Sequence, residues 1–138
     1  PDELNAFLGE LDFEIPSSDI IIQRENVYYL PSLAGKLKGL RAMRTGTLLG
    51  ELKKNRFEPS QAFAMTLKNG QYSSQVNLRL SDDAVIRYLK GETIEVDEAC
   101  VTGSNSIKLI MVDGFPLGWG KYNNEQIKNK YLPGWRWQ

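Results

Sequence analysis

Short apolar runs separated by turn-forming residues constrain the fold of this chain more than any other feature of its sequence. Runs such as 20–22 and 109–112 have the length of a β-strand, and none approaches the roughly 20 apolar residues that a membrane-spanning helix needs. The chain has 138 residues, 41% of them hydrophobic and 25% charged, so it can bury one core of ordinary size. The sequence therefore predicts a small globular fold built from many short elements.

Periodicity and turn signals predict three helices among a larger number of strands. Residues 2–13 carry apolar side chains at the spacing of one helix face. Ser60 is expected to cap a second helix that runs to about Lys68, and residues 81–83 open a third that ends at Gly91. Strands are expected at 19–23 and 27–30 as a hairpin, in two segments between 40 and 52 that turn at Thr45-Gly46, at 76–80, 93–96 and 106–112, and after Gly114. This pattern indicates an α+β fold with a partly closed β-barrel.

Several classes of catalysis are excluded by composition. The chain contains no histidine, so imidazole acid–base chemistry, His-dependent nucleophiles and His-ligated metals are absent. The single cysteine, Cys100, follows acidic residues that raise rather than lower a thiol pKa, which favours a structural role. No glycine-rich loop has the lysine and hydroxyl residue of a phosphate loop, and no cluster has metal-ligand spacing. We therefore expect no catalytic activity from the chain itself.

Charge is segregated along the chain although the total is zero. Residues 1–34 have a net charge of −6, residues 35–56 a net charge of +6, and residues 113–138 a net charge of +2. The two basic segments can form one positive face, or the acidic and basic segments can neutralise each other in the fold. Charge alone leaves these two interpretations open.

The last 26 residues combine aromatic and basic side chains. Aromatic rings can stack on bases while lysine and arginine contact phosphate, a mixture that suits RNA. The alternative is that the tryptophans belong to the core, which we favour for Trp119 because it lies between two glycines. Trp135 and Trp137, close to the end, are harder to bury.

The same segment resembles a known family. Residues 114–121 (GFPLGWGK), 127–129 (IKN) and 131–136 (YLPGWR) look like the closing motif of bacterial rRNA cytosine-5 methyltransferases of the RsmF, or Sun-type, group. Weaker similarities to the same C-terminal region occur at 46–51 (GTLLGE), 56–60 (RFEPS) and 88–92 (YLKGE). The resemblance runs from about Val27 to Arg136, and residues 1–26 carry no recognisable match.

The resemblance implies a PUA-like RNA-binding domain that follows a catalytic domain. It divides the chain into a first C-terminal segment, 1–55, and a PUA-like domain, 56–138, packed as one unit with about three short helices. Because the chain begins at Pro1 and lacks the family's Pro-Cys nucleophile, we expect it to be a piece of a longer enzyme. S-adenosylmethionine is then expected on the missing catalytic domain, with no cofactor or metal on this piece. The expected RNA contacts are Lys36, Lys38, Arg41, Arg44, Lys121, Lys128, Asn129 and Arg136.

Three functional alternatives remain open from the sequence. The chain can be the rRNA-positioning module of a cytosine-5 methyltransferase, the PUA-like module of another RNA-modifying enzyme, or a packing domain for the catalytic domain. For Lys121 and Asn129, stabilisation of a turn competes with direct RNA contact. We expect a cytoplasmic monomer without membrane association, with ribosomal RNA and the catalytic domain of the same chain as partners.

Overall fold

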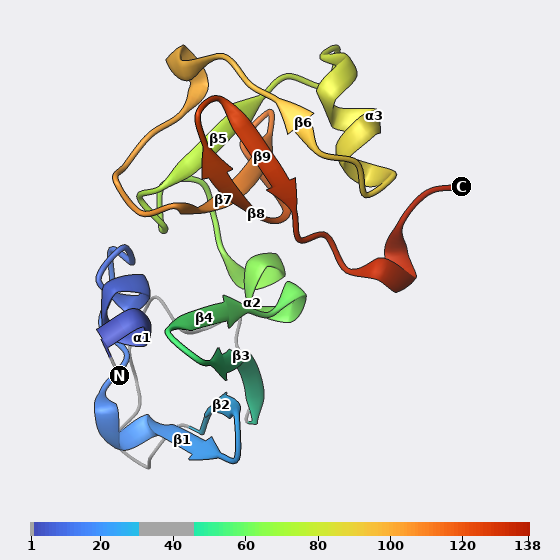
Figure 1. Ribbon diagram of the computed structural model, residues 1–138. Coiled ribbons are helices and arrows are strands. Elements are labelled where there is room, and N and C mark those ends of the chain that lie inside the picture. Colours follow the sequence, from blue (N-terminus) through green and yellow to red (C-terminus); the bar gives the residue numbers. More distant parts are fainter. Residues whose placement is uncertain (1, 31–45) are drawn as a thin grey trace.

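The computed structural model describes residues 2–30 and 46–138, and within them two β-sheets lie one above the other with three α-helices around them (Figure 1). The elements, in chain order, are α1 (Asp2–Leu8), β1 (Ile20–Gln23), β2 (Asn26–Tyr29), β3 (Thr47–Lys53), β4 (Arg56–Pro59), α2 (Gln61–Thr66), β5 (Gln75–Leu78), α3 (Asp83–Leu89), β6 (Ile94–Glu95), β7 (Ile107–Val112), β8 (Phe115–Asn123) and β9 (Gln126–Asn129). None of the helices in this part of the chain has the length and apolarity needed to cross a membrane.

The first sheet is antiparallel and has the strand order β1-β2-β3-β4. The β1–β2 hairpin confirms the hairpin predicted over 19–30. Strand β3 confirms the later of the two strands predicted between 40 and 52, whereas the earlier one, at 40–44, lies outside the described residues. Strand β4 was not predicted, because its sequence Arg-Phe-Glu-Pro has only one strongly apolar residue and ends in proline.

The second sheet is a curled half-barrel with the order β5-β7-β8-β9-β6. Strands β5 and β7 are parallel, and the other pairs in this sheet are antiparallel. Asp113 and Gly114, both at positive φ, form the tight turn between β7 and β8, as expected for an Asp-Gly hairpin. The α+β class and the partly closed, PUA-like barrel are thus confirmed.

The beginning of α2 follows a local capping signal, whereas the end of α1 does not follow the local pattern. The Ser60 hydroxyl accepts a hydrogen bond from the Phe63 amide and caps α2, as predicted. The helix predicted over 2–13 was too long, because α1 ends at Leu8. Beyond it, the 10–12 segment pairs with 71–73: the Asp12 amide donates to the Gln71 carbonyl at 2.8 Å. These long-range hydrogen bonds replace the last helical turn that periodicity alone favours.

An aromatic cluster joins the two sheets into one body. Phe7 of α1 is fully buried and its ring lies 4.9–5.9 Å from the rings of Phe57, Phe63, Tyr72 and Trp119. These five rings come from both sheets and from α1 and α2, so the halves share a core. The boundary expected after residue 55 falls in the turn that joins β3 to β4, two strands of one sheet.

A second apolar cluster fills the half-barrel beneath α3. It contains Val85, Tyr88 and Leu89 of α3 together with Ile110 and Ile127 from the sheet. Strand β7 serves both clusters, since Leu109 and Met111 belong to the first and Ile110 to the second. Burial on both faces explains why residues 109–112 of this strand are all apolar rather than alternating.

Candidate nucleic-acid interface

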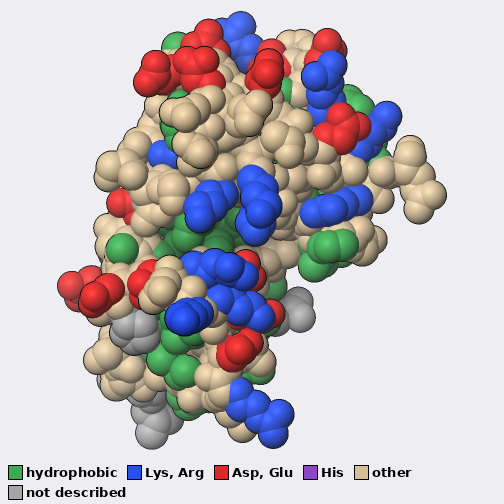
Figure 2. Space-filling view, viewed as in Figure 1, with side chains coloured by type: hydrophobic (Ala, Val, Ile, Leu, Met, Phe, Trp, Pro, Cys, Tyr) green, Lys and Arg blue, Asp and Glu red, His purple; other side chains and the backbone are tan. Residues whose placement is uncertain are grey.

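A basic cleft lies where the two sheets meet. It has a volume of about 450 Å³ and is lined by the β3–β4 hairpin, α1 and strands β7 to β9. Figure 2 shows Lys and Arg side chains on both sides of a hollow in the middle of this face. Its charged lining residues are four basic and two acidic: Arg56, Lys121, Lys128, Lys130, Glu3 and Glu58.

Lys121 and Lys128 line the cleft on the side of the second sheet. They are directly paired residues on the antiparallel strands β8 and β9, so their side chains project from the same face of the sheet. Both are exposed, and none of the salt bridges among the described residues involves either of them. Like charges placed directly opposite each other destabilise a strand pair, and a bound anion would relieve that repulsion.

The other two basic residues of the cleft share one carboxylate. Arg56 Nε lies 3.2 Å from the Glu58 carboxylate, and Lys130 Nζ lies 3.9 Å from the same oxygen. One acid therefore faces two cations that come from different sheets. Such partly exposed ion pairs are weak, so both cations can exchange Glu58 for a phosphate at little cost.

The floor of the cleft is apolar and closed. Phe57 and Trp119 line it but are 3% and 1% exposed, and both belong to the shared core. The Trp119 indole N–H is satisfied by the Ser60 carbonyl at 2.7 Å, which confirms the core role expected for this residue. Polar groups of Asn55, Asn105 and Ser106 complete the walls. The cleft therefore offers cations and hydrogen-bonding groups rather than an open stacking surface.

Asn129, another expected RNA contact, is occupied within the chain. Its Nδ2 donates to the Tyr88 and Glu92 carbonyls at 2.8 and 2.9 Å, and its Oδ1 accepts from the Tyr131 amide at 2.8 Å. These bonds tie the end of β9 to the C-terminal end of α3. Its amide therefore performs the structural role that the sequence left open as an alternative.

Arg136 lies apart from the basic cleft, over the end of α3. Its Nε donates to the Tyr131 carbonyl at 3.1 Å, and its side chain packs against Gly91 so closely that a Cβ on that glycine would overlap it. Arg136 is half-buried and does not line the cleft with Lys121 and Lys128.

Two family models match the chain. Residues 6–67 match the RsmF rRNA methyltransferase first C-terminal domain, and residues 75–137 match the methyltransferase RsmF PUA domain. The chain belongs to the RsmF rRNA methyltransferase family. The curated proteins include no sequence that matches it.

The RsmF match extends closer to the N-terminus than the resemblance read from motifs. It begins at residue 6, whereas residues 1–26 were expected to carry no match. The matched part of α1 contributes the buried Phe7, which belongs to an apolar helix face of spaced single residues rather than to a contiguous motif. The first RsmF match ends at residue 67, so it includes β4 and α2.

Two cleft residues were absent from the expected RNA contacts of this RsmF region. Arg56 was part of the basic segment 35–56 and Lys130 part of the closing segment, but neither stood out as a site residue. Their convergence depends on contact between β4 and the end of β9, which no local pattern reveals. The remaining expected contacts, Lys36, Lys38, Arg41 and Arg44, lie outside the described residues, and their place on the same face stays a prediction.

Proposed function

We propose that this part of an RsmF-type enzyme binds ribosomal RNA in the basic cleft and positions it for the catalytic domain of the same protein. The observation that carries the proposal is the Lys121–Lys128 pair, two exposed cations held side by side without a carboxylate partner among the described residues. The cleft lies between the two RsmF C-terminal domains, so an RNA bound there contacts both.

The cleft is suited to phosphate rather than to base recognition. Lysine acts as a compact point charge toward phosphate, and phosphate contacts position a nucleic acid without reading its sequence. Arg56 adds a guanidinium from the opposite wall, with a planar fork that matches phosphate oxygens. Sequence or site selection is then left to the catalytic domain or to other contacts.

We place S-adenosylmethionine on the catalytic domain rather than on this chain. The glycine pattern 114–120 lies in a hairpin and in strand β8, not in a loop between a strand and a helix. The space above Gly118 is filled by Tyr88 and Gln61, and that above Gly120 by Ile127. These glycines therefore allow close packing and leave no cradle for a cofactor. A monomeric state and a cytoplasmic location complete the proposal.

The salt dependence of RNA binding tests this function. Anisotropy titrations of a fluorescently labelled rRNA fragment, at several salt concentrations, compare the unmodified chain with Lys121→Ala and Lys128→Ala. Each variant is expected to bind more weakly and to flatten the slope of log affinity against log salt by roughly 0.7 to 0.9. Because each substitution removes one of two facing cations, the thermal stability should stay unchanged or rise slightly.

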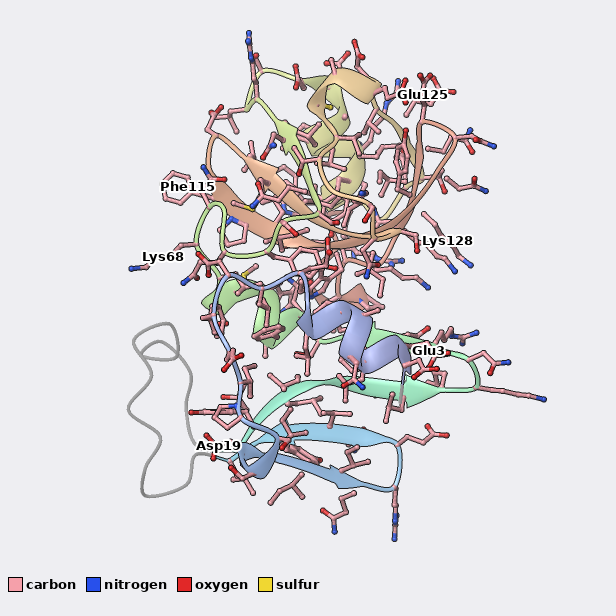
Figure 3. All side chains as sticks on the ribbon, turned by 90° about the vertical axis from the view of Figure 1, so that its left-hand side faces the viewer. Glu3, Asp19, Lys68, Phe115, Glu125 and Lys128 are labelled. Atoms are coloured by element: carbon pink, nitrogen blue, oxygen red, sulfur yellow. The ribbon has the colours of Figure 1, made fainter. Side chains whose placement is uncertain are left out.

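Lys68→Ala is the matched control. Lys68 is an exposed lysine on the opposite side of the molecule from Lys128 (Figure 3), and its removal should change neither affinity nor slope. If all three variants behave alike, the cleft is not the RNA site. Absence of salt-dependent RNA binding by the unmodified chain would instead favour a packing module for the catalytic domain.

A further inference from the structure

Two exposed tryptophans lie in the C-terminal segment that follows the cleft residue Lys130 in sequence. Trp135 and Trp137 are 49% and 53% exposed, in contrast to Trp119 at 1%. Large aromatic side chains are usually well buried, so half-exposed indoles need a reason. Between Gln126 and the C-terminal end the chain carries Lys128, Lys130 and Arg136 and no acidic residue.

The segment that carries the tryptophans is anchored to the domain. The Trp137 amide donates to the Leu89 carbonyl at 2.8 Å, and Arg136 Nε donates to the Tyr131 carbonyl. Pro133–Trp135 forms a short 3₁₀ turn, and the Trp135 ring meets the edge of the Tyr131 ring at 6.2 Å. The segment that carries the two indoles is thus tied to α3 and to Tyr131, while about half of each tryptophan remains exposed.

We propose that Trp135 and Trp137 stack on unpaired bases of the RNA whose phosphates occupy the basic cleft. The inference rests on the proposed function and narrows its substrate to RNA with single-stranded nucleotides next to the cleft-bound segment. Lys130 lines the cleft, and the ring of the next residue, Tyr131, lies 6.2 Å from the ring of Trp135, so one RNA strand can pass from phosphate contacts in the cleft to stacking contacts beside it.

The charge around the tryptophans favours RNA over an apolar protein surface as the partner. Arg136 lies between them in sequence, and the neighbouring helix α3 adds Arg87 in its last turn. A protein interface of the apolar kind is depleted of charge at its centre. Indole rings flanked by cations are instead the combination that single-stranded nucleic acid requires.

Duplex RNA does not offer its base faces to the two tryptophans. In an A-form helix the base faces are covered by their neighbours, and proteins read its shape and backbone. Stacking on tryptophan needs bases that are already unpaired, as in a loop, a bulge or a strand end. The structure therefore favours RNA that presents a phosphate-lined segment continuous with exposed bases.

Intrinsic fluorescence supplies a direct test. The chain has three tryptophans, and Trp119 is 1% exposed in the floor of the cleft, so a double variant, Trp135→Phe with Trp137→Phe, gives the part of any quenching that comes from Trp119. An unlabelled 12-nucleotide single strand should quench the emission of Trp135 and Trp137, whereas a duplex of the same sequence should bind through the cleft with little quenching. Equal quenching by the duplex would overturn the proposal.

Substitutions separate stacking from phosphate binding. Trp135→Ala and Trp137→Ala should each weaken single-strand binding roughly 5- to 150-fold, the range for one stacked base, while the salt slope stays unchanged. Trp→Phe variants should restore most of the affinity but not the fluorescence. Phe115→Ala is the control, since Phe115 is 71% exposed and lies on the opposite side from Lys128 (Figure 3).

The outcomes distinguish the two proposals. Loss of affinity on removing Lys121 or Lys128, with Trp135→Ala and Trp137→Ala binding normally, retains the cleft and overturns stacking. Loss of affinity that is equal for single strand and duplex also overturns stacking. A chain that binds no RNA overturns the proposed function itself. Circular dichroism and thermal melting of each variant verify that the fold is intact.

Discussion

Replacing Asn129 by alanine tests whether this residue holds the fold or contacts RNA. The substitution removes three hydrogen bonds, to the Tyr88 and Glu92 carbonyls and from the Tyr131 amide. A typical intramolecular hydrogen bond contributes about 0.5–1.5 kcal/mol net. Two circumstances moderate the loss: the Tyr88 carbonyl keeps a bond from the Gly91 amide at 2.9 Å, and Glu92 is exposed to water. We expect Asn129→Ala to lower the free energy of unfolding by about 2–3 kcal/mol.

The measurement is thermal or urea unfolding, treated as a two-state transition for a chain of this size. For a domain of this length the loss corresponds to a melting temperature lowered by roughly 7–10 °C. Asn77→Ala is the matched control, because Asn77 is exposed on β5, and it should change the stability by less than about 0.5 kcal/mol. An Asn129→Ala protein as stable as the unmodified chain, yet weaker in RNA binding, would refute the structural reasoning.

Two further predictions concern packing and thiol chemistry. Gly120→Ala should lower the free energy of unfolding by about 1–3 kcal/mol, because a Cβ at this position would overlap the fully buried Ile127. Gly134→Ala is the control and should leave the stability unchanged, since nothing lies within 4 Å of a Cβ placed there. Urea unfolding of both variants checks this prediction. Burial, and then the nearby Asp97 carboxylate, raises the pKa of the Cys100 thiol. Its thiolate fraction is therefore lowered, so at pH 8 alkylation should be slower than in the urea-unfolded chain and should accelerate at higher pH; equal rates in both states would contradict this.

Elements specified by local signals could be predicted from the sequence. Ser60 caps α2 because its short hydroxyl side chain accepts a hydrogen bond from the amide of Phe63, three residues further along the chain. The hairpin of β1 and β2 follows from two short β-rich runs with a turn between them. Both features depend on residues close together in sequence, and neither requires knowledge of the rest of the fold.

Elements that depend on contacts between distant residues could not be predicted from the sequence. Residues 10–12 continue the helical periodicity, yet they pair with the 71–73 segment, and the Glu10 carboxylate accepts hydrogen bonds from Ser73 and Ser74. Strand β4 is short and rich in polar residues, and it exists because β3 supplies its hydrogen-bonding partner. In both cases tertiary contacts override the local preference.

The two sides of the basic cleft differ in the same way: one depends on local sequence and the other on distant contacts. Asn124 and Glu125 both have positive φ and form the two-residue turn that pairs Asn123 with Gln126, which in turn places Lys121 opposite Lys128. A two-residue hairpin turn that begins at Asn124 would have predicted the pairing of Lys121 with Lys128 from the sequence. The opposite wall could not be derived, because Arg56 lines the cleft only where the aromatic core around Phe7 packs the first sheet against β8. The Lys121–Lys128 pair thus depends on a local turn, whereas the complete cleft depends on tertiary packing. A variant that loosens the packing around Phe7 should therefore weaken RNA binding although all basic residues of the cleft are kept.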